Sequence, residues 1–412
     1  MTKRIGIIWW WAAGMMVAAT LCEKHTDATI IVFEKNKELW TKVRISGGGR
    51  CNVTTWFFKK QDLQHKYTRW RGFLSHAMWQ FWPRKMQSRC SEHGVELTCE
   101  DDMRVFPSSN KSTDIVDMFM NIIGGNVSVH FNEAAVWIKK HGTEFVLSTD
   151  KDSYEFDVIV ITTWWNAYAH TGSTWDGYDL AKQLGHSITT LWPSLNSFLI
   201  EEERIKECSG ISFQRAWLRS EGIQIAGPLL LTHFGISWPV TFTYSSHIPY
   251  IPVSSHEPHT ILRTPFADRT MQRWQQRLDS KAQEDSRKQL STILWYEFTK
   301  RRVDSFLHNY AIDGAIMISN VSRDQRKHIA KLLGDGMSLT LIARRPWDEF
   351  VTAWWVSTDE VSPKTMESNL CPWLYFAGEV LNIDAVTWWF NFQSCRATGR
   401  CAWESILSTL SH

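Results

Sequence analysis

Glycine is scarce in this sequence. The chain has 22 glycines among 412 residues, whereas an average glycine content of ~7% would give about 29. Tryptophan is in excess, with 24 residues, and several of them form runs at 9–11, 164–165, 354–355 and 388–389. Each run follows an apolar stretch, at a turn where a nucleotide-binding fold would need glycine. The pattern therefore indicates that tryptophan has replaced glycine at these turns.

Paired cysteines and metal-ligand motifs are also missing. The 8 cysteines include no CxxC pair and no zinc spacing, which argues against a zinc site and a redox-active dithiol. This usage is typical of a reducing, cytoplasmic compartment. His256 and His259 lie close together, but Pro258 and a predicted loop make them a poor ligand pair. We predict no metal, and we find no Ser-His-Asp or Cys-His arrangement that would predict a catalytic side chain.

A membrane segment is the next class to consider. Ile5 to Cys22 carries no charge and follows Lys3 and Arg4, as in a signal peptide or signal anchor. No convincing small-x-small cleavage site follows, whereas a strand and an acidic residue do follow in register. We therefore predict no membrane segment. The net charge of +2 favours no particular class of partner.

The stretch from Arg4 to Lys35 predicts a dinucleotide-binding unit. Arg4–Ile8 is typical of a buried parallel strand, 15–24 of a helix, and Thr29–Phe33 of a second strand that ends on Glu34. Such a unit needs glycine at 9, 11 and 14, and places an acid about 20 residues further on for the ribose hydroxyls. Only Gly14 is present, so we predict a dinucleotide fold whose phosphate cradle is blocked.

A glycine-rich stretch follows at 46–52. Gly47, Gly48 and Gly49 can form a turn whose N–H groups point at an anion or a ring edge. Arg50 adds a positive charge, and Asn52 adds a donor and an acceptor. Taken alone, this stretch fits a mobile loop and a binding loop about equally well.

In context, these motifs resemble one enzyme family. The residues at 5–34 and 43–54 together are similar to the BaiN-like NAD(P)/FAD-dependent oxidoreductases, or aminoacetone-oxidase-family FAD-binding enzymes. GPLLLTHFGIS at 227–237 and the strand and turn at 374–379 extend the resemblance over nearly the whole chain. The resemblance implies that these cofactor-binding positions are retained: Gly14, Glu34, Lys35, Arg44, Gly48, Gly49, Arg50, Cys51, Asn52, Gly378, Glu379 and Asp384. It implies that these are lost: Trp9, Trp10, Trp11, Trp164, Trp165, Trp388 and Trp389.

The resemblance also implies the fold. We expect a doubly wound, Rossmann-like α/β FAD-binding domain, interrupted by a β-rich insert with a helical subdomain. The discontinuous FAD-binding domain would comprise 1–190 and 346–412, and the insert 191–345. Within the insert we expect strands at 191–262 and 335–345 and helices at 263–334.

Further segments of the chain also carry structural expectations. We expect 154–163 to form one buried strand, and the strands at 127–130, 135–139 and 144–148 to form a small antiparallel layer. The segment 57–89 is basic and aromatic. It fits two amphipathic helices covering the sheet better than a single-stranded nucleic-acid surface, because its charges follow no single stripe.

We expect the function of this chain to differ from that of the family. In the family, FAD takes a hydride from a nicotinamide nucleotide or a small substrate. Here the indoles at three turns would occupy the cofactor cleft, so we predict that no FAD binds and that the chain is inactive. One alternative is a working oxidoreductase that uses FAD and NAD(P)H on an unknown small molecule. Another is a nucleic-acid or protein binding module that uses 57–89.

Overall fold

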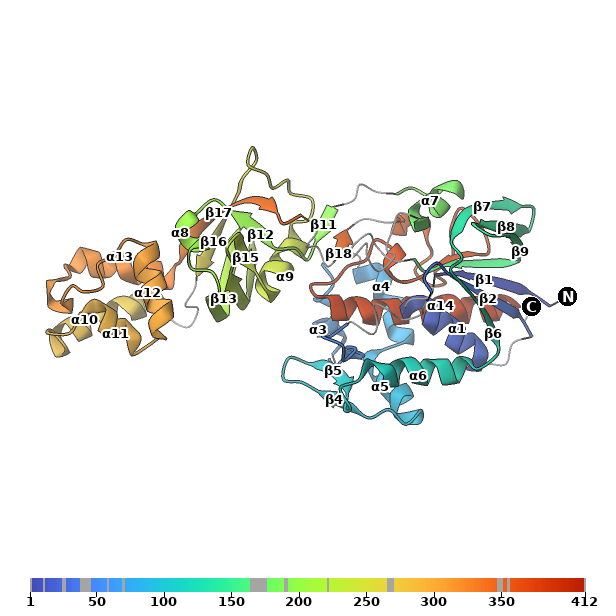
Figure 1. The fold of residues 1–412 in the computed structure, drawn as a ribbon, viewed down its shortest axis with the longest axis horizontal. Coiled ribbons are helices and arrows are strands. Elements are labelled where there is room, and N and C mark those ends of the chain that lie inside the picture. Colours follow the sequence, from blue (N-terminus) through green and yellow to red (C-terminus); the bar gives the residue numbers. More distant parts are fainter. Residues whose placement is uncertain are drawn as a thin grey trace. The chain divides into compact units, whose positions relative to one another are not determined.

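The computed structural model describes residues 2–9, 12–23, 27–37, 46–57, 59–68, 71–163, 176–188, 192–220, 222–264, 270–346, 351–353 and 356–410. Contacts divide the chain into two compact units (Figure 1). The first comprises Met1–Trp192 and Phe350–His412, and the second comprises Pro193–Glu349.

A parallel sheet forms the centre of the first unit. Its strand order is β19-β10-β1-β2-β6. The strands are β1 (Arg4–Ile8), β2 (Thr29–Glu34), β6 (Val127–Phe131), β10 (Val158–Ile161) and β19 (Leu374–Phe376). The central strands are continuous apolar runs because both faces of the sheet are covered. Ile5 pairs with Ile30 on one side and with Val158 on the other.

Helices cover one face of this sheet. α1 (Ala12–Glu23) packs against α6 (Ser112–Ile123) and the long α14 (Trp388–Leu410) (Figure 1). α1 is buried from Ala12 to Cys22, which explains its uncharged sequence without a membrane. It begins three residues before the helix predicted at 15–24. No helix within the described ranges is long and apolar enough to cross a membrane.

An antiparallel sheet covers the other face. It consists of β7 (Ala135–His141), β8 (Glu144–Thr149) and β9 (Ser153–Phe156), and β8 and β9 contact the parallel sheet. The prediction of one strand over 154–163 was wrong, because the chain changes sheets at Asp157. The Asp157 carboxylate accepts hydrogen bonds from Arg4 N at 2.8 Å and Lys3 Nζ at 2.6 Å, which anchors the corner.

β6 also differs from its prediction. The strand at 127–130 was expected in the small antiparallel layer, but it pairs with β2 in the parallel sheet, with Val32 opposite Val129. Its residues are half-buried or exposed, and it is the last strand in the order of the sheet, so β6 is an edge strand. The sheet that such a strand joins is revealed only by its pairing with a strand distant in the sequence, here β2.

The remaining elements of the first unit are helices and two small sheets. Three helices, where two were expected, occupy the basic aromatic segment: α3 (Lys60–Gln64), α4 (Arg71–Gln80) and α5 (Pro83–Glu92). A three-stranded sheet has the order β3-β5-β4. Its strands are β3 (Thr54–Thr55), β4 (Leu97–Cys99) and β5 (Arg104–Pro107). A separate two-stranded sheet pairs β11 (Trp192–Ser194) with β18 (Val351–Ala353), and α7 is the helix Asp176–Gln183.

The second unit contains a closed barrel with the order β12-β15-β14-β13-β16-β17. Its strands are β12 (Phe198–Ile200), β13 (Ser212–Ser220), β14 (Ile223–Leu231), β15 (Gly235–Ser237), β16 (His259–Thr264) and β17 (Met337–Arg344). The helices are α8 (Glu203–Lys206), α9 (Pro239–His247), α10 (Met271–Glu284), α11 (Leu290–Trp295), α12 (Lys300–Asn309) and α13 (Arg323–Gly334).

Candidate functional site

The turn after β1 is formed around Trp9. Its φ of 75° lies in the region that favours glycine, as does the φ of 84° at Trp238. Trp9 N donates to Phe33 O at 3.0 Å, and the Thr162 hydroxyl donates to Trp9 O at 2.5 Å. Both partners lie at the carboxyl ends of neighbouring parallel strands, the edge at which open α/β sheets bind ligands.

The indole of Trp9 hydrogen-bonds to the acid of the dinucleotide motif. Trp9 Nε1 donates to Glu34 Oε1 at 3.0 Å. The same oxygen accepts from Asn36 N at 2.9 Å and from Asn36 Nδ2 at 2.7 Å. Trp9 and Glu34 are buried, with 9% and 3% of their surfaces exposed. Since a carboxylate is acceptor-only, its burial requires donors of this kind.

The side chain of Lys35 lies over the ring of the Trp9 indole. Its ammonium lies 4.4 Å from the centroid of the Trp9 ring, within the range of a cation–π interaction. The same ammonium forms an ion pair of 2.7 Å with Asp176 at the start of α7. Lys35 therefore holds the indole and α7 together rather than projecting into an open cleft.

One cavity that the described residues form beside this indole is small. The cavity that Trp9 lines with Lys35, Glu133 and Asp176 has a volume of ≈ 10 Å³, enough for about one water molecule. A Cβ atom at Gly14 would lie 2.6 Å from Trp9 O. Gly14 is thus required by the packing of α1 on the turn.

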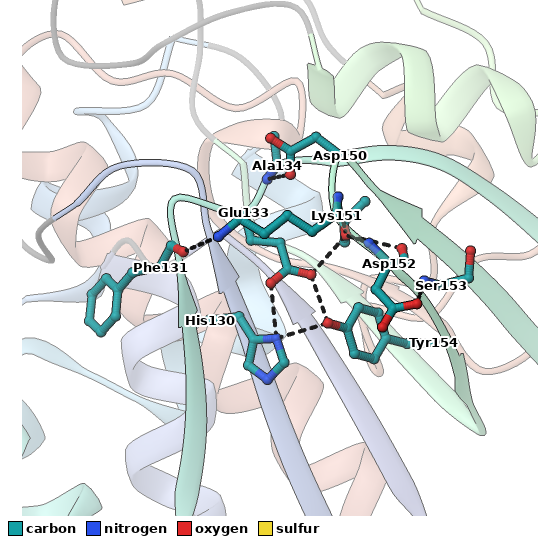
Figure 2. Close-up of polar contacts among 10 residues, drawn as sticks. His130, Phe131, Glu133, Ala134, Asp150, Lys151, Asp152, Ser153 and Tyr154 are labelled. Atoms are coloured by element: carbon teal, nitrogen blue, oxygen red, sulfur yellow. Dashed lines mark hydrogen bonds and ion pairs between the residues drawn. The ribbon is translucent and has the colours of Figure 1, made fainter.

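A second buried carboxylate, that of Glu133, borders the same cavity. Figure 2 shows its polar contacts. Glu133 accepts hydrogen bonds from the Tyr154 hydroxyl and the Thr149 hydroxyl, each at 2.8 Å. Its other oxygen lies 3.1 Å from His130 Nδ1. Burial, followed by the Glu133 carboxylate, raises the pKa of Tyr154 to about 12. This cluster supports the turn between β6 and β7.

The glycine turn at 46–52 is the second part of the predicted site. Gly47, Gly48 and Gly49 have φ values of 61°, 69° and 89°, and Cys51 follows at 59°. Arg50 forms an ion pair of 2.6 Å with Glu100, and its guanidinium lies 3.9 Å from the Phe106 ring centroid. Arg50 thus fastens the turn to β5.

Buried sulfur and guanidinium groups lie beneath this turn. Arg396, on α14, is fully buried and donates to Val53 O. Burial raises the pKa of the Cys51 thiol, while Arg396 acts in the opposite direction. Because the thiol form is favoured, Cys51 is poorly suited to act as a nucleophile.

The segment before α14 contains the third part of the predicted site. η4 (Gly378–Val380) is a short 3-10 helix, and Gly378 has a φ of 81°. Gly378 N donates to the Thr398 hydroxyl at 2.9 Å. Glu379 and Asp384 are buried, with 2% and 1% exposed. Burial, and then the Glu379 carboxylate, raise the pKa of Tyr178 well above its usual value.

Trp389 lies in the first turn of α14. Its ring centroid is 5.8 Å from that of Phe390, and the Arg104 guanidinium lies over it at 5.6 Å. Trp389 is half-buried, whereas Trp9 is buried. The two tryptophans therefore pack differently, although the sequence predicted the same effect for both.

Several predicted site residues lie outside the described residues. These are Trp10, Trp11, Arg44, Trp164 and Trp165, and the side chain of Trp388 is likewise not described. The sequence analysis in turn missed Thr162, Asp176 and Glu133. A threonine that ends a buried parallel strand was the available signal for Thr162, since such ends meet at the ligand-binding edge.

Some side chains of the basic aromatic segment 57–89 form contacts inside the protein. Arg89 is buried and forms an ion pair of 2.6 Å with Glu23, and Lys66 lies 5.4 Å from the Phe57 ring centroid. Trp79 is 73% exposed. Among the described residues there is no group of three or more His, Cys, Asp or Glu side chains that could hold a metal.

Comparison with known proteins gives the family. The chain matches the family described as HI0933-like protein Rossmann domain over residues 4–405. It belongs to this family. This HI0933-like chain is 23% identical over 411 residues to the 3-dehydro-bile acid delta(4,6)-reductase of Clostridium scindens, covering 97% of this chain and 98% of the relative. It is 24% identical over 389 residues to the ribosomal RNA dihydrouridine synthase of Haemophilus influenzae, covering 93% of each.

The solved structures include a flavocytochrome c3 fumarate reductase in an open conformation. It has a TM-score of 0.44 and 15% identity, and the match covers 98% of this chain and 79% of that chain.

Family and fold indicate the scaffold of an FAD-binding oxidoreductase, which confirms the predicted resemblance and fold class. In such a scaffold the acid after the second strand binds the ribose hydroxyls of the adenosine. Here the Glu34 carboxylate accepts the Trp9 indole N–H. Trp9 also borders the narrow cavity beside it. The Oε1 oxygen of Glu34 thus accepts hydrogen bonds from two residues of the chain itself, Trp9 and Asn36.

Proposed function

We propose that this chain keeps the scaffold of an FAD-dependent oxidoreductase but does not hold FAD, and so lacks FAD-dependent activity. The observation that carries the proposal is the hydrogen bond from the Trp9 indole to Glu34, which is buried. Any adenosine that used Glu34 would have to displace the indole first.

Displacing the indole would cost enough free energy to weaken cofactor binding strongly. A hydrogen bond to a charged group contributes about 1.5–3 kcal/mol, and burial of a large aromatic side chain contributes roughly 2–3 kcal/mol. A loss of ~4 kcal/mol weakens binding about a thousandfold. The tryptophans at 10–11, 164–165 and 388 are proposed to add to this effect.

The test is a titration of the purified full-length chain with FAD, followed by visible flavin absorbance and by equilibrium dialysis. We expect a colourless protein that retains no FAD. Trp9→Gly should raise FAD affinity at least tenfold, and Trp79→Gly serves as an exposed control. A native chain that purifies with stoichiometric FAD would overturn the proposal.

That last outcome would support the alternative, a working oxidoreductase. The family would then imply NAD(P)H and a small-molecule substrate as partners. The relatives are named for reduction of a bile-acid derivative and for synthesis of dihydrouridine in ribosomal RNA, so both substrate classes would be assayed.

All 8 cysteines are free thiols, which supports a cytoplasmic location.

A further inference from the structure

A large cavity lies beside α5 and β4 in the first unit. Its volume is ≈ 890 Å³, which is within the range of about 300–1,000 Å³ that ligand-binding cavities have. α5 and β4 contact each other (Figure 1), and residues of both line the cavity. The residues that line it do not include Trp9, Arg50 or Trp389, so this cavity is distinct from the candidate functional site.

α5 turns a polar face toward this cavity. Residues three or four positions apart lie on the same side of a helix, and the lining residues of α5 follow this spacing. They are Arg84, Gln87, Ser88, Ser91 and Glu92, here called the α5 stripe. Met86 and Cys90, on the opposite side of the helix, are fully buried. Gln87 Nε2 donates to Thr55 O at 3.2 Å, which fixes the helix beside the small sheet.

β4 has an edge that no strand in the described part of the chain pairs with, because β4 is last in the order β3-β5-β4. Glu96 O accepts a hydrogen bond from Ser108 N at 2.9 Å, which turns the backbone groups of Glu96 toward β5. In an antiparallel pair, successive residues turn these groups to opposite sides. The N–H and C=O groups of Leu97, and likewise those of Cys99, therefore point away from β5. Leu97 also lines the cavity.

Charged side chains lie at both ends of the α5 stripe. Arg84 is at the N-terminal end of α5, Glu92 is at its C-terminal end, and Glu96 follows the turn before β4. All three are exposed, and none forms an ion pair with another described residue. Arg84 and Glu92 are eight positions apart, which is about 12 Å along a helix. An extended chain covers that distance in about four residues.

We propose that this cavity binds an extended peptide segment of a partner protein, which adds a strand to the outward edge of β4. Hydrogen bonds between the two backbones hold the added strand. A lysine or arginine of the segment pairs with Glu92 and Glu96, and an acidic residue about four positions away pairs with Arg84. A nucleic acid fits less well, because two of the three charged groups are acidic. The inference does not depend on whether the chain binds FAD.

Fluorescence anisotropy with the full-length chain tests the proposal. The probe is a short, blocked, labelled peptide of alternating valine and threonine, with a lysine near one end and a glutamate four residues later. We expect saturable binding, which weakens about two- to fivefold when either charged residue of the peptide is replaced by glutamine. Methylation of the backbone nitrogens along one edge of the peptide should weaken it about tenfold, because the donors for β4 are lost.

Three results would overturn the proposal. Absence of saturable binding would leave the acidic residues as a means of keeping the β4 edge from pairing with other chains. A single-stranded oligonucleotide that displaces the peptide would show that the partner is a nucleic acid. Concentration-dependent dimerisation of the chain that the peptide reverses would show that a second copy occupies this edge.

Leu97→Pro tests the strand addition from the side of the protein. Proline removes the outward N–H group and leaves the bonds to β5 in place. Leu97→Ala is the matched control, because it loses the same side chain but keeps the N–H group. We expect peptide binding to be about fivefold weaker in Leu97→Pro than in Leu97→Ala. Equal affinity of the two folded variants would overturn the strand addition. If Leu97→Pro does not fold, the methylated peptide decides the same point.

A double variant tests the acidic end of the cavity. Glu92→Gln with Glu96→Gln should weaken binding of the lysine peptide about fivefold, and should not change binding of the peptide in which glutamine replaces lysine. Glu155→Gln, at an exposed position on β9, should leave both affinities unchanged. Equal losses for both peptides in the double variant would contradict the proposed pairing with a basic residue.

Discussion

Trp9 illustrates how a residue in an unfavourable backbone conformation can be held in place. A left-handed conformation costs a residue with a side chain about 1–2 kcal/mol. Here the amide, the carbonyl and the indole N–H of Trp9 each form a hydrogen bond, to Phe33, Thr162 and Glu34 respectively. Several bonds to one residue determine its position, which is the condition under which such strain persists.

At the residue scale, Trp9→Phe should isolate the indole N–H. Phenylalanine keeps most of the buried ring but removes one donor to the buried Glu34 carboxylate. We expect the free energy of unfolding to fall by about 1–3 kcal/mol, measured by urea denaturation. Trp79→Phe, at an exposed position, should change it by less than about 0.5 kcal/mol. Equal effects at both positions would contradict this account of the Trp9–Glu34 bond.

At the scale of elements, His186 connects the end of α7 to the segment around 356–376. Its Nδ1 lies 3.1 Å from Glu360 Oε2 and its Nε2 lies 2.8 Å from the Ser368 hydroxyl. Burial lowers the pKa of His186, and Glu360 opposes that shift only in part. The neutral imidazole is therefore the form that the folded protein favours.

The lowered pKa of His186 predicts that the folded protein is less stable at acidic pH. Because the folded pKa lies below the unfolded value of about 6.5, the unfolded chain takes up the proton first as the pH falls. The stabilisation is complete above about pH 6.5 and is lost as the pH falls toward the folded pKa. Denaturant titrations between neutral and mildly acidic pH should show this loss. His186→Gln should flatten the pH profile, whereas the exposed His256→Gln should leave it unchanged.

At the scale of the whole molecule, the second unit has a hydrophobic core of its own, made by the barrel strands and the helices. Leu339 is fully buried there, on β17. Leu339→Ala should lower the free energy of unfolding by about 2–5 kcal/mol and speed hydrogen exchange in β16 and β17. Leu370→Ala, 52% exposed in the first unit, should have little effect. Unchanged exchange in the barrel would show that this core is not what stabilises it.

Local sequence was sufficient for much of the first unit. The apolar runs at 4–8 and 29–33 predicted β1 and β2, since a strand buried on both faces carries a continuous apolar sequence. The same reasoning failed at 154–163 because it did not take Asp157, a residue type common in turns, as the corner between β9 and β10. It failed at 127–130 because an edge strand can join either sheet.

The sequence by itself determined the family, the α/β class, the strand–helix–strand order of β1, α1 and β2, and where along the chain Trp9 and Trp389 stand. Only the tertiary structure decided how those positions act. Trp9 is buried on the Glu34 carboxylate, whereas Trp389 is half-buried beside Phe390 and Arg104. The physical reason is that the effect of an indole depends on which donors, acceptors and cations the other segments bring to it. Those partners come from residues up to hundreds of positions away, such as Arg104 for Trp389.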